Sequence, residues 1–169
     1  ALILSDPSGN YDFQEILTGE PSKNFMMSQD LKTSGRMKSG AYWMHFILEN
    51  KNDRNQDWVI SLVEKNFRNV VLYSRTPAGY WVTTTTGAAV PVELRPRKTN
   101  ELSFHVTIAR GEKRDYFLRV ESRLFRNLKV VVQSDLDSEE SGMLIHFVTS
   151  AYFGILIALV FSSLFFYLI

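Results

Sequence analysis

The sequence predicts an all-β fold, an antiparallel β-sandwich of the jelly-roll type, followed by one transmembrane α-helix. Seven or eight short strand-like segments succeed one another at hairpin spacing, and no helical period occurs before residue 143. The stretch 143–169 contains no Asp, Glu, Lys or Arg, and a helix of that length exceeds the roughly 30 Å hydrocarbon core of a bilayer. We therefore expect a sandwich over 1–134, an acidic linker over 135–142 and a membrane span over 143–169.

The bulk composition narrows the possible classes of protein. The 169 residues have a formal net charge of +1, and the basic residues are scattered, which argues against a nucleic-acid-binding protein. Because the sequence has no cysteine, no disulfide can hold the fold, and packing alone must stabilise it. The absence of cysteine is also compatible with a bacterial periplasm. Since the sequence ends at the predicted span, we expect it to be part of a longer chain.

The N-terminal residues 2–40 are the least regular part of the sequence. Within them, Asp6-Pro7-Ser8-Gly9 has the composition of a β-turn, because proline presets φ and glycine accepts positive φ. The polar, Gly- and Ser-rich stretch 28–40 predicts a loop.

From residue 41 onward the pattern is that of β-strands. Residues 42–48 are bulky at nearly every position, which is typical of a strand covered on both faces. Residues 102–108 alternate between apolar and polar side chains, which predicts one buried and one open face. Prolines flank 92–95, which predicts an edge strand or an extended loop there. The remaining predicted strands are 58–63, 70–74, 80–83, 116–122 and 128–134.

An ordered set of short motifs carries a resemblance to a known family. They are Asp6-Pro7-Ser8-Gly9, residues 42–50 (YWMHFILEN), Trp58-Val59-Ile60-Ser61-Leu62, Val70-Val71-Leu72-Tyr73, Arg95-Pro96, residues 116–120 (YFLRV) and Tyr152-Phe153-Gly154. Together they resemble the type 2 extracellular sensor domain of bacterial seven-transmembrane receptors with diverse intracellular signalling modules (7TMR-DISM), including the first transmembrane helix. The resemblance implies a jelly-roll sandwich similar to carbohydrate-binding modules. It also implies a position in the periplasm, next to the bacterial inner membrane, and a cytoplasmic kinase, cyclase or phosphatase as the output.

Sugar recognition calls for flat apolar faces and for polar groups that bind hydroxyls in pairs. We therefore expect a ligand site among aromatic and charged residues, namely Trp43, His45, Tyr80, Trp81, Arg95, Arg97 and Arg119. Plain core packing is the competing interpretation of Trp43, and a solvated loop residue is that of Arg95. The family commonly has Arg where this chain has His45, and histidine would contact an anionic ligand group only when protonated.

A metal site is the second candidate. Asp53, Asn55 and Asp57 alternate in a polar turn, and carboxylate and amide oxygens are the ligands that calcium prefers. The sixth position of an EF-hand loop is glycine, whereas this chain has Trp58, so only a looser oxygen cage is compatible with the sequence. An ordinary hairpin turn is the alternative.

Nothing local in the sequence supports catalysis, because the three histidines lie on different elements and no nucleophile motif or phosphate loop is present. We expect a non-enzyme. The leading hypothesis is a periplasmic sensor domain of a membrane receptor that binds carbohydrate or a related small molecule and transmits the signal across the membrane. The alternatives are an interaction module that forms a homodimer, or a heterodimer with another receptor, and a calcium-responsive sensor.

Overall fold

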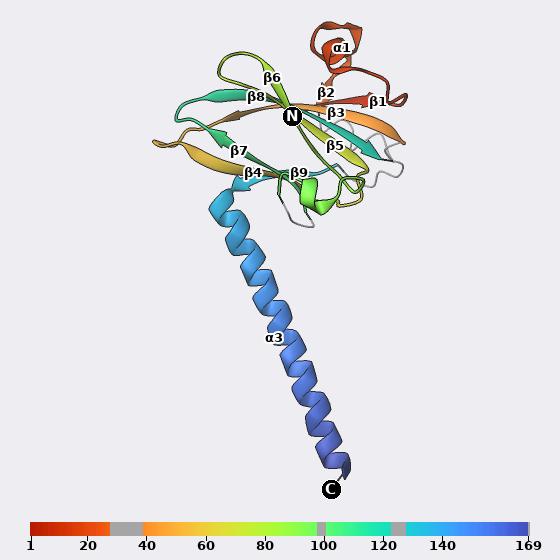
Figure 1. Ribbon diagram of the computed structural model, residues 1–169, viewed down its shortest axis with the longest axis vertical. Coiled ribbons are helices and arrows are strands. Elements are labelled where there is room, and N and C mark those ends of the chain that lie inside the picture. Colours follow the sequence, from red (N-terminus) through yellow and green to blue (C-terminus); the bar gives the residue numbers. More distant parts are fainter. Residues whose placement is uncertain (28–38, 98–100, 123–127, 169) are drawn as a thin grey trace. The chain divides into compact units, whose positions relative to one another are not determined.

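The computed structural model describes residues 1–27, 39–97, 101–122 and 128–168. The chain forms two compact units, Ala1–Val132 and Gln133–Ile169, and each is described by itself. Figure 1 labels the strands and the helices α1 and α3 of the described residues. The strands are β1 (Leu2–Asp6), β2 (Met26–Met27), β3 (Gly40–Glu49), β4 (Gln56–Leu62), β5 (Asn69–Arg75), β6 (Trp81–Thr86), β7 (Leu102–Ile108), β8 (Lys113–Ser122) and β9 (Val130–Ser134). The helical elements are α1 (Phe13–Thr18), the 3₁₀ turns η1 (Glu20–Asn24) and η2 (Val92–Leu94), and α3 (Asp135–Leu168).

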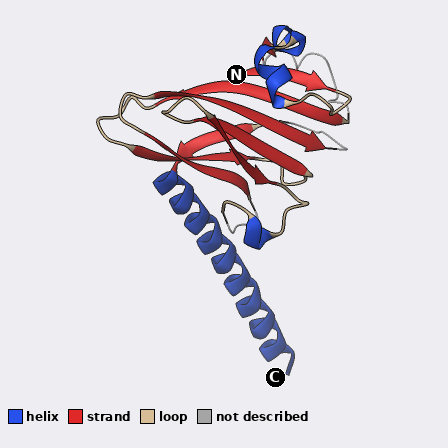
Figure 2. Ribbon diagram, turned by 45° about the horizontal axis from the view of Figure 1, so that its top comes forward, coloured by secondary structure: helices blue, strands red, loops and turns tan. Residues whose placement is uncertain are grey.

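The strands form two sheets that lie as two layers in Figure 2. One sheet has six strands in the order β2-β1-β3-β8-β5-β6, and the other has three in the order β7-β4-β9. Neighbouring strands of the larger sheet are antiparallel, as are β4 and β7. The predicted β-sandwich is confirmed, whereas the finer jelly-roll topology is not.

The main core lies between the two sheets. It is built from alternate residues of the facing strands, as a period-2 pattern requires. In β7 the predicted alternation is confirmed in part: Leu102, Phe104 and Ile108 are buried and His105 and Thr107 are exposed, but Ser103 of the predicted open face is also buried. The buried members of this core are Ile3, Tyr42, Met44, Ile60, Leu62, Phe67, Val70, Leu72, Leu102, Phe104, Ile108, Tyr116, Leu118 and Val120.

A second, smaller core covers the opposite face of the six-stranded sheet, which we call the outer face. Its buried members are Leu4, Ile16, Trp43 and Phe117. The bulky run in β3 is thereby explained, because Tyr42 and Met44 face the main core while Trp43 faces the outer one. The strand is covered on both faces, as the sequence predicts.

The helix α1 is a feature that the sequence analysis did not predict. Asp12 caps it, since its Oδ1 accepts a hydrogen bond from Glu15 N–H at 2.8 Å, and Glu15 Oε2 accepts one from Asp12 N–H at 3.0 Å. This capping box begins a helix whose residues Phe13, Ile16 and Leu17 join the outer core. A short amphipathic helix therefore closes part of the outer face.

The prediction for residues 92–95 was wrong in detail. Residues 92–95 form neither an edge strand nor an extended loop, because Leu94 N–H donates to Pro91 O at 3.0 Å and closes the 3₁₀ turn η2. Residues 135–142, the predicted acidic linker, belong to α3. The loop predicted over 28–40 lies outside the described residues except for its last two positions.

The predicted turn over residues 6–9 is present, and a second turn follows β5. Gly9 N–H donates to Asp6 O at 3.1 Å, and Gly79 N–H donates to Thr76 O at 2.9 Å. Residues 148–163, whose side chains are described, lie within α3. Within the described part of the chain, no helix combines the length and the apolar character needed to cross a membrane. The membrane span predicted over 143–169 is thus not confirmed.

Candidate functional site

The outer face of the six-stranded sheet is divided into a covered part and an open end. The covered part lies over Trp43, which is 0% exposed beneath the outer core. Toward the other end of β3 the side chains become accessible, and Ile47 is 58% exposed. The open end of this face is therefore the surface on which a ligand can reach the sheet.

Aromatic rings connect the covered part to the open end. The ring of Phe13, from α1, stacks on Tyr73 with centroids 4.0 Å apart. Trp81 meets Phe13 edge-on at 5.1 Å and Phe117 edge-on at 5.5 Å. His45 stacks on Phe117 with centroids 4.3 Å apart and planes 12° from parallel. We call six residues the outer aromatic cluster, namely Phe13, Trp43, His45, Tyr73, Trp81 and Phe117.

Arg119 closes the covered end of this cluster. Its guanidinium carbon lies 5.8 Å from the ring centroid of Trp43, and its Nη2 donates to Gly9 O at 2.8 Å. The turn that presents Gly9 is fixed by Asp6, which is fully buried. Asp6 Oδ1 accepts from Ser8 Oγ at 2.7 Å and from Gly9 N at 2.8 Å, and its Oδ2 accepts from the Tyr11 N–H at 3.1 Å. The motif 6–9 thus holds Arg119 in place.

Tyr73 lies beneath α1 in the same cluster. Burial raises the pKa of its hydroxyl above the ordinary value, and the positive charge of Arg119 opposes this shift while Asp12 adds to it. The hydroxyl therefore stays neutral at physiological pH. Its role in the cluster is packing rather than charge.

His45 and Asp115 lie side by side at the open end. They lie diagonally on the neighbouring strands β3 and β8, where His45 is opposite Phe117 and Asp115 is opposite Ile47, and His45 Nε2 and Asp115 Oδ1 are 3.2 Å apart. The two side chains are 26% and 36% exposed, so both are accessible to a ligand. Asp115 also lines a cavity, and the pair therefore joins the aromatic cluster to that cavity.

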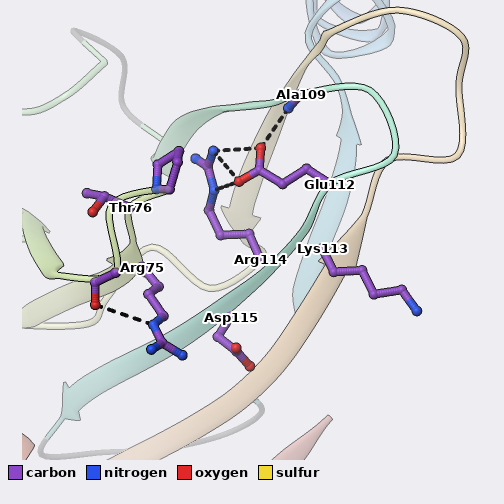
Figure 3. Close-up of a pocket in the computed structure, with 9 residues that line it drawn as sticks. Arg75, Thr76, Ala109, Glu112, Lys113, Arg114 and Asp115 are labelled. Carbon is purple, nitrogen blue, oxygen red and sulfur yellow. Dashed lines mark hydrogen bonds and ion pairs between the residues drawn. The ribbon is translucent and has the colours of Figure 1, made fainter.

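The cavity, which we call the end cavity, has a volume of about 530 Å³. It lies where the turn before β6 meets the turn before β8, and Figure 3 shows the side chains that line it. Its lining consists of Arg75, Thr76, Pro77, Gly79, Ala109, Glu112, Lys113, Arg114 and Asp115. Its size suits a small ligand of one or two rings.

A charged pair forms one wall of the end cavity. Arg114 Nη2 lies 2.8 Å and 2.9 Å from the two oxygens of Glu112, and Arg114 Nε lies 2.9 Å from the nearer one (Figure 3). Burial raises the pKa of Glu112, but the hydrogen bond from Ala109 N–H and the interactions with Arg114 outweigh burial, so the net pKa lies below its ordinary value. Glu112 is therefore ionised, and its charge cancels that of Arg114.

The structure brings together four of the seven predicted ligand residues. Trp43, His45, Trp81 and Arg119 all lie in or against the outer aromatic cluster. Tyr80 immediately precedes Trp81 and is 64% exposed. His45, Tyr80 and Trp81 therefore stand at the open end, which is where a ligand can reach them.

Trp43, Arg119, Arg95 and Arg97 need a different interpretation. Trp43 is fully buried, so its ring is a core residue and has no free face for a sugar; this is a correction to its expected role. Only 16% of the Arg119 side chain is exposed, and it is engaged by Gly9 and Trp43. Arg95 Nε donates to Val90 O at 2.9 Å and so braces the segment of η2. Neither Arg95 nor Arg97 belongs to the described lining of the end cavity.

The predicted metal residues are engaged by other groups. Asp53 Oδ1 lies 3.4 Å from Arg110 Nη2, Asn55 Oδ1 accepts from Arg110 N–H at 3.1 Å, and Asp57 Oδ1 accepts from Thr107 Oγ1 at 2.6 Å. Among the described residues, no three His, Cys, Asp or Glu side chains are placed to hold a metal ion. The arrangement is that of a hairpin turn braced against its neighbour, and it does not support the calcium cage.

Sequence reasoning missed several residues of the open end. Arg75 and Asp115 lie far apart in sequence and come together because β5 and β8 are neighbours. The sequence signal for Arg75 was its position, since it is a charged residue at the end of a strand and next to a Pro-Gly turn. The spacing of Asp12 and Glu15 before an apolar run was the signal for the missed helix.

Comparison with known protein families shows to which family the chain belongs. Residues 1–134 match the model of the family described as 7TMR-DISM extracellular 2. The chain belongs to this family. The resemblance found in the sequence motifs is thereby confirmed, and the match covers the whole described sandwich. No curated protein matches the chain.

Membership in the 7TMR-DISM extracellular 2 family fixes the broad role. The chain carries a sensor domain of a membrane receptor, and this domain belongs on the periplasmic side. The family is one of sensor domains rather than of catalytic ones. The open end of the outer face is thus the candidate sensing surface of a 7TMR-DISM extracellular domain.

Proposed function

We propose that this domain senses a carbohydrate or a related small molecule, which binds in the end cavity and against the neighbouring aromatic residues. The observation that carries the proposal is the cavity of about 530 Å³ beside Tyr80 and Trp81. Gly79 lines the cavity, and the two aromatic residues follow it directly in the chain. A hydroxylated ring needs both apolar faces and polar groups, and the open end supplies both.

The polar groups of the open end suit hydroxyl recognition. The carboxylate of Asp115 accepts hydrogen bonds, and His45 beside it can donate or accept. Both residues are partly exposed, so a hydroxyl can replace water on them without the cost of opening the core. Binding can signal only if the ligand favours one arrangement of the receptor over another. We propose that the signal passes through the sandwich to a cytoplasmic output domain.

A binding experiment with matched variants tests the proposal. The chain is purified in a mild detergent and applied to an array of acidic and neutral oligosaccharides. We expect saturable binding that Trp81→Ala weakens by roughly tenfold or more, the order expected for losing one aromatic contact. Val82→Ala is the control, because Val82 lies on the same strand, is 44% exposed and faces away from the outer cluster. Equal binding by the two variants, or an array without any binding, contradicts the proposal.

A second candidate is self-association through the exposed edge of the large sheet. Met26 and Met27 of the edge strand β2 are 54% and 64% exposed, and Leu2, which pairs with Met27, is 36% exposed. An exposed apolar edge can pair with the same strand of a second copy around a two-fold axis. Sedimentation over a range of concentrations tests this: dimers that Met27→Lys abolishes support the second candidate, and a monomer at every concentration excludes it.

A further inference from the structure

The end cavity contains a cation that forms no ion pair with a carboxylate of the described residues. This is Arg75, the last residue of β5, which is exposed and lines the cavity. The hydrogen bond of its guanidinium is to a neutral carbonyl, since its Nε donates to Gly79 O at 3.4 Å. That bond is long and leaves most of the planar donor edge of the guanidinium available.

The other cations of the cavity already have anionic partners. Arg114 is held by both oxygens of Glu112, as described above. Lys113 Nζ lies 3.5 Å from Glu49 Oε1, and its side chain extends away from Arg75 in Figure 3. Asp115 Oδ1 lies 3.2 Å from His45 Nε2, within hydrogen-bond distance. Of the three cations that line the cavity, Arg75 is the one that forms no ion pair with a carboxylate of the described residues.

The turn that follows Arg75 holds its backbone in a fixed conformation. Tyr80 O accepts from Thr76 N at 2.8 Å and from Thr76 Oγ1 at 3.0 Å, and Gly79 N donates back to Thr76 O at 2.9 Å. Gly79 has φ of 94°, which glycine adopts without strain. A turn closed by these bonds fixes the backbone next to Arg75, so only its side chain has to be ordered on binding.

The register of the strands places an aromatic ring and an acceptor beside Arg75. Arg75 is the direct cross-strand partner of Trp81 in β6. On the other side, the pairing of β5 with β8 ends at Ser74 and Tyr116, so Asp115 lies beside Arg75 one position beyond it; Asp115 also lines the cavity. A cation, an aromatic ring and a carboxylate acceptor thus line one short row at the open end of the outer face.

We propose that the ligand of this site is a sugar acid, whose carboxylate pairs with Arg75 while its hydroxyls donate to Asp115 and its ring lies against Trp81. This inference rests on the proposed function and names its ligand class. Guanidinium binds carboxylate through two parallel hydrogen bonds, which gives both strength and orientation. A monoanion fits better than a phosphate dianion, because the carboxylates of Asp115 and Glu112 line the same cavity and repel a second negative charge.

The test compares each acidic ligand with its own neutral form. An array carries uronate- and sialate-containing oligosaccharides, each beside its methyl ester, and the full chain is applied in a mild detergent. We expect the free acids to bind, the esters to bind at least tenfold more weakly, and Arg75→Gln to remove this preference. The roughly ten- to hundredfold loss follows from the strength of charge-assisted hydrogen bonds. Binding of the acids should also weaken with added salt.

A matched variant separates local from general charge effects. Arg68→Gln removes an exposed arginine just before the opposite end of β5, roughly 23 Å along the strand, and should keep the preference for acids. Esters that bind as well as acids, or an unchanged preference in Arg75→Gln, overturn the inference while leaving the proposed function standing. An array on which neither form binds overturns both.

Discussion

Replacing Asp6 by alanine should destabilise the sandwich more than its position near the N-terminus suggests. The carboxylate is fully buried and accepts three hydrogen bonds, from Ser8 Oγ, Gly9 N and Tyr11 N. Bonds to a charged group contribute about 1.5–3 kcal/mol each, but three bonds to one group are not additive. We therefore expect Asp6→Ala to lower the free energy of unfolding by about 3 kcal/mol, since two backbone N–H groups also lose their acceptor.

The assay is urea unfolding followed by tryptophan fluorescence. With a slope of about 2 kcal/mol per molar urea, the midpoint should fall by about 1.5 M. Ser8→Ala is the matched control, because it removes one of the three donors and leaves the carboxylate in place; it should cost about 1 kcal/mol or less. Asp6→Asn should fall between the two, since the amide keeps one acceptor oxygen. If Asp6→Ala is no worse than Ser8→Ala, the carboxylate does not organise the turn and our account of the Arg119 contact fails with it.

Three further predictions follow from single contacts. Ile16→Ala should lower the free energy of unfolding by about 2–5 kcal/mol, because Ile16 is 1% exposed in the outer core, whereas Ile16→Met should cost under about 1.5 kcal/mol in the same urea assay. Gly87→Ala should lower the melting temperature more than Gly79→Ala. Both glycines have positive φ, but a Cβ at Gly87 would lie 2.5 Å from Arg68 O, whereas one at Gly79 would meet open space. Equal losses of melting temperature in the two variants would contradict the clash. The lowered pKa of Glu112 means that its contribution to stability is present above the ordinary value of 4.5 and is lost as the pH falls below it. Acid unfolding of Glu112→Gln should therefore lack part of the pH dependence of the parent, and identical profiles would refute this.

The strands could be predicted from the sequence because their signal is local. The alternation over 102–108 and the doubly apolar run 42–48 depend on neighbouring residues alone, and both match observed strands. The helix α1 was missed because six residues are too few for a helical period to stand out. Its Asp12–Glu15 capping box was nevertheless visible in the sequence.

The site was predicted less well because it depends on which strands are neighbours. His45, Asp115 and Arg75 come from β3, β8 and β5, and only the strand order brings them to one end of a sheet. The Pro-Gly turn before Trp81 favoured an exposed position and core packing was favoured for Trp43, but nothing local shows which residues α1 covers. The covering segment is itself distant in sequence from both.

Contacts between aromatic rings connect the open end of the outer face to α1. Trp81, at the open end, contacts Phe13 of α1 and Phe117 of β8. Phe13 in turn stacks on Tyr73, beneath the helix. A ligand that lies against Trp81 therefore acts on a ring that already packs against α1, and closely packed interiors transmit small displacements. If sensing uses this route, Phe13→Leu should leave ligand affinity nearly unchanged and reduce signalling by the intact receptor, because it removes the edge-on contact without touching the end cavity. A loss of both together would instead place Phe13 in the binding site itself.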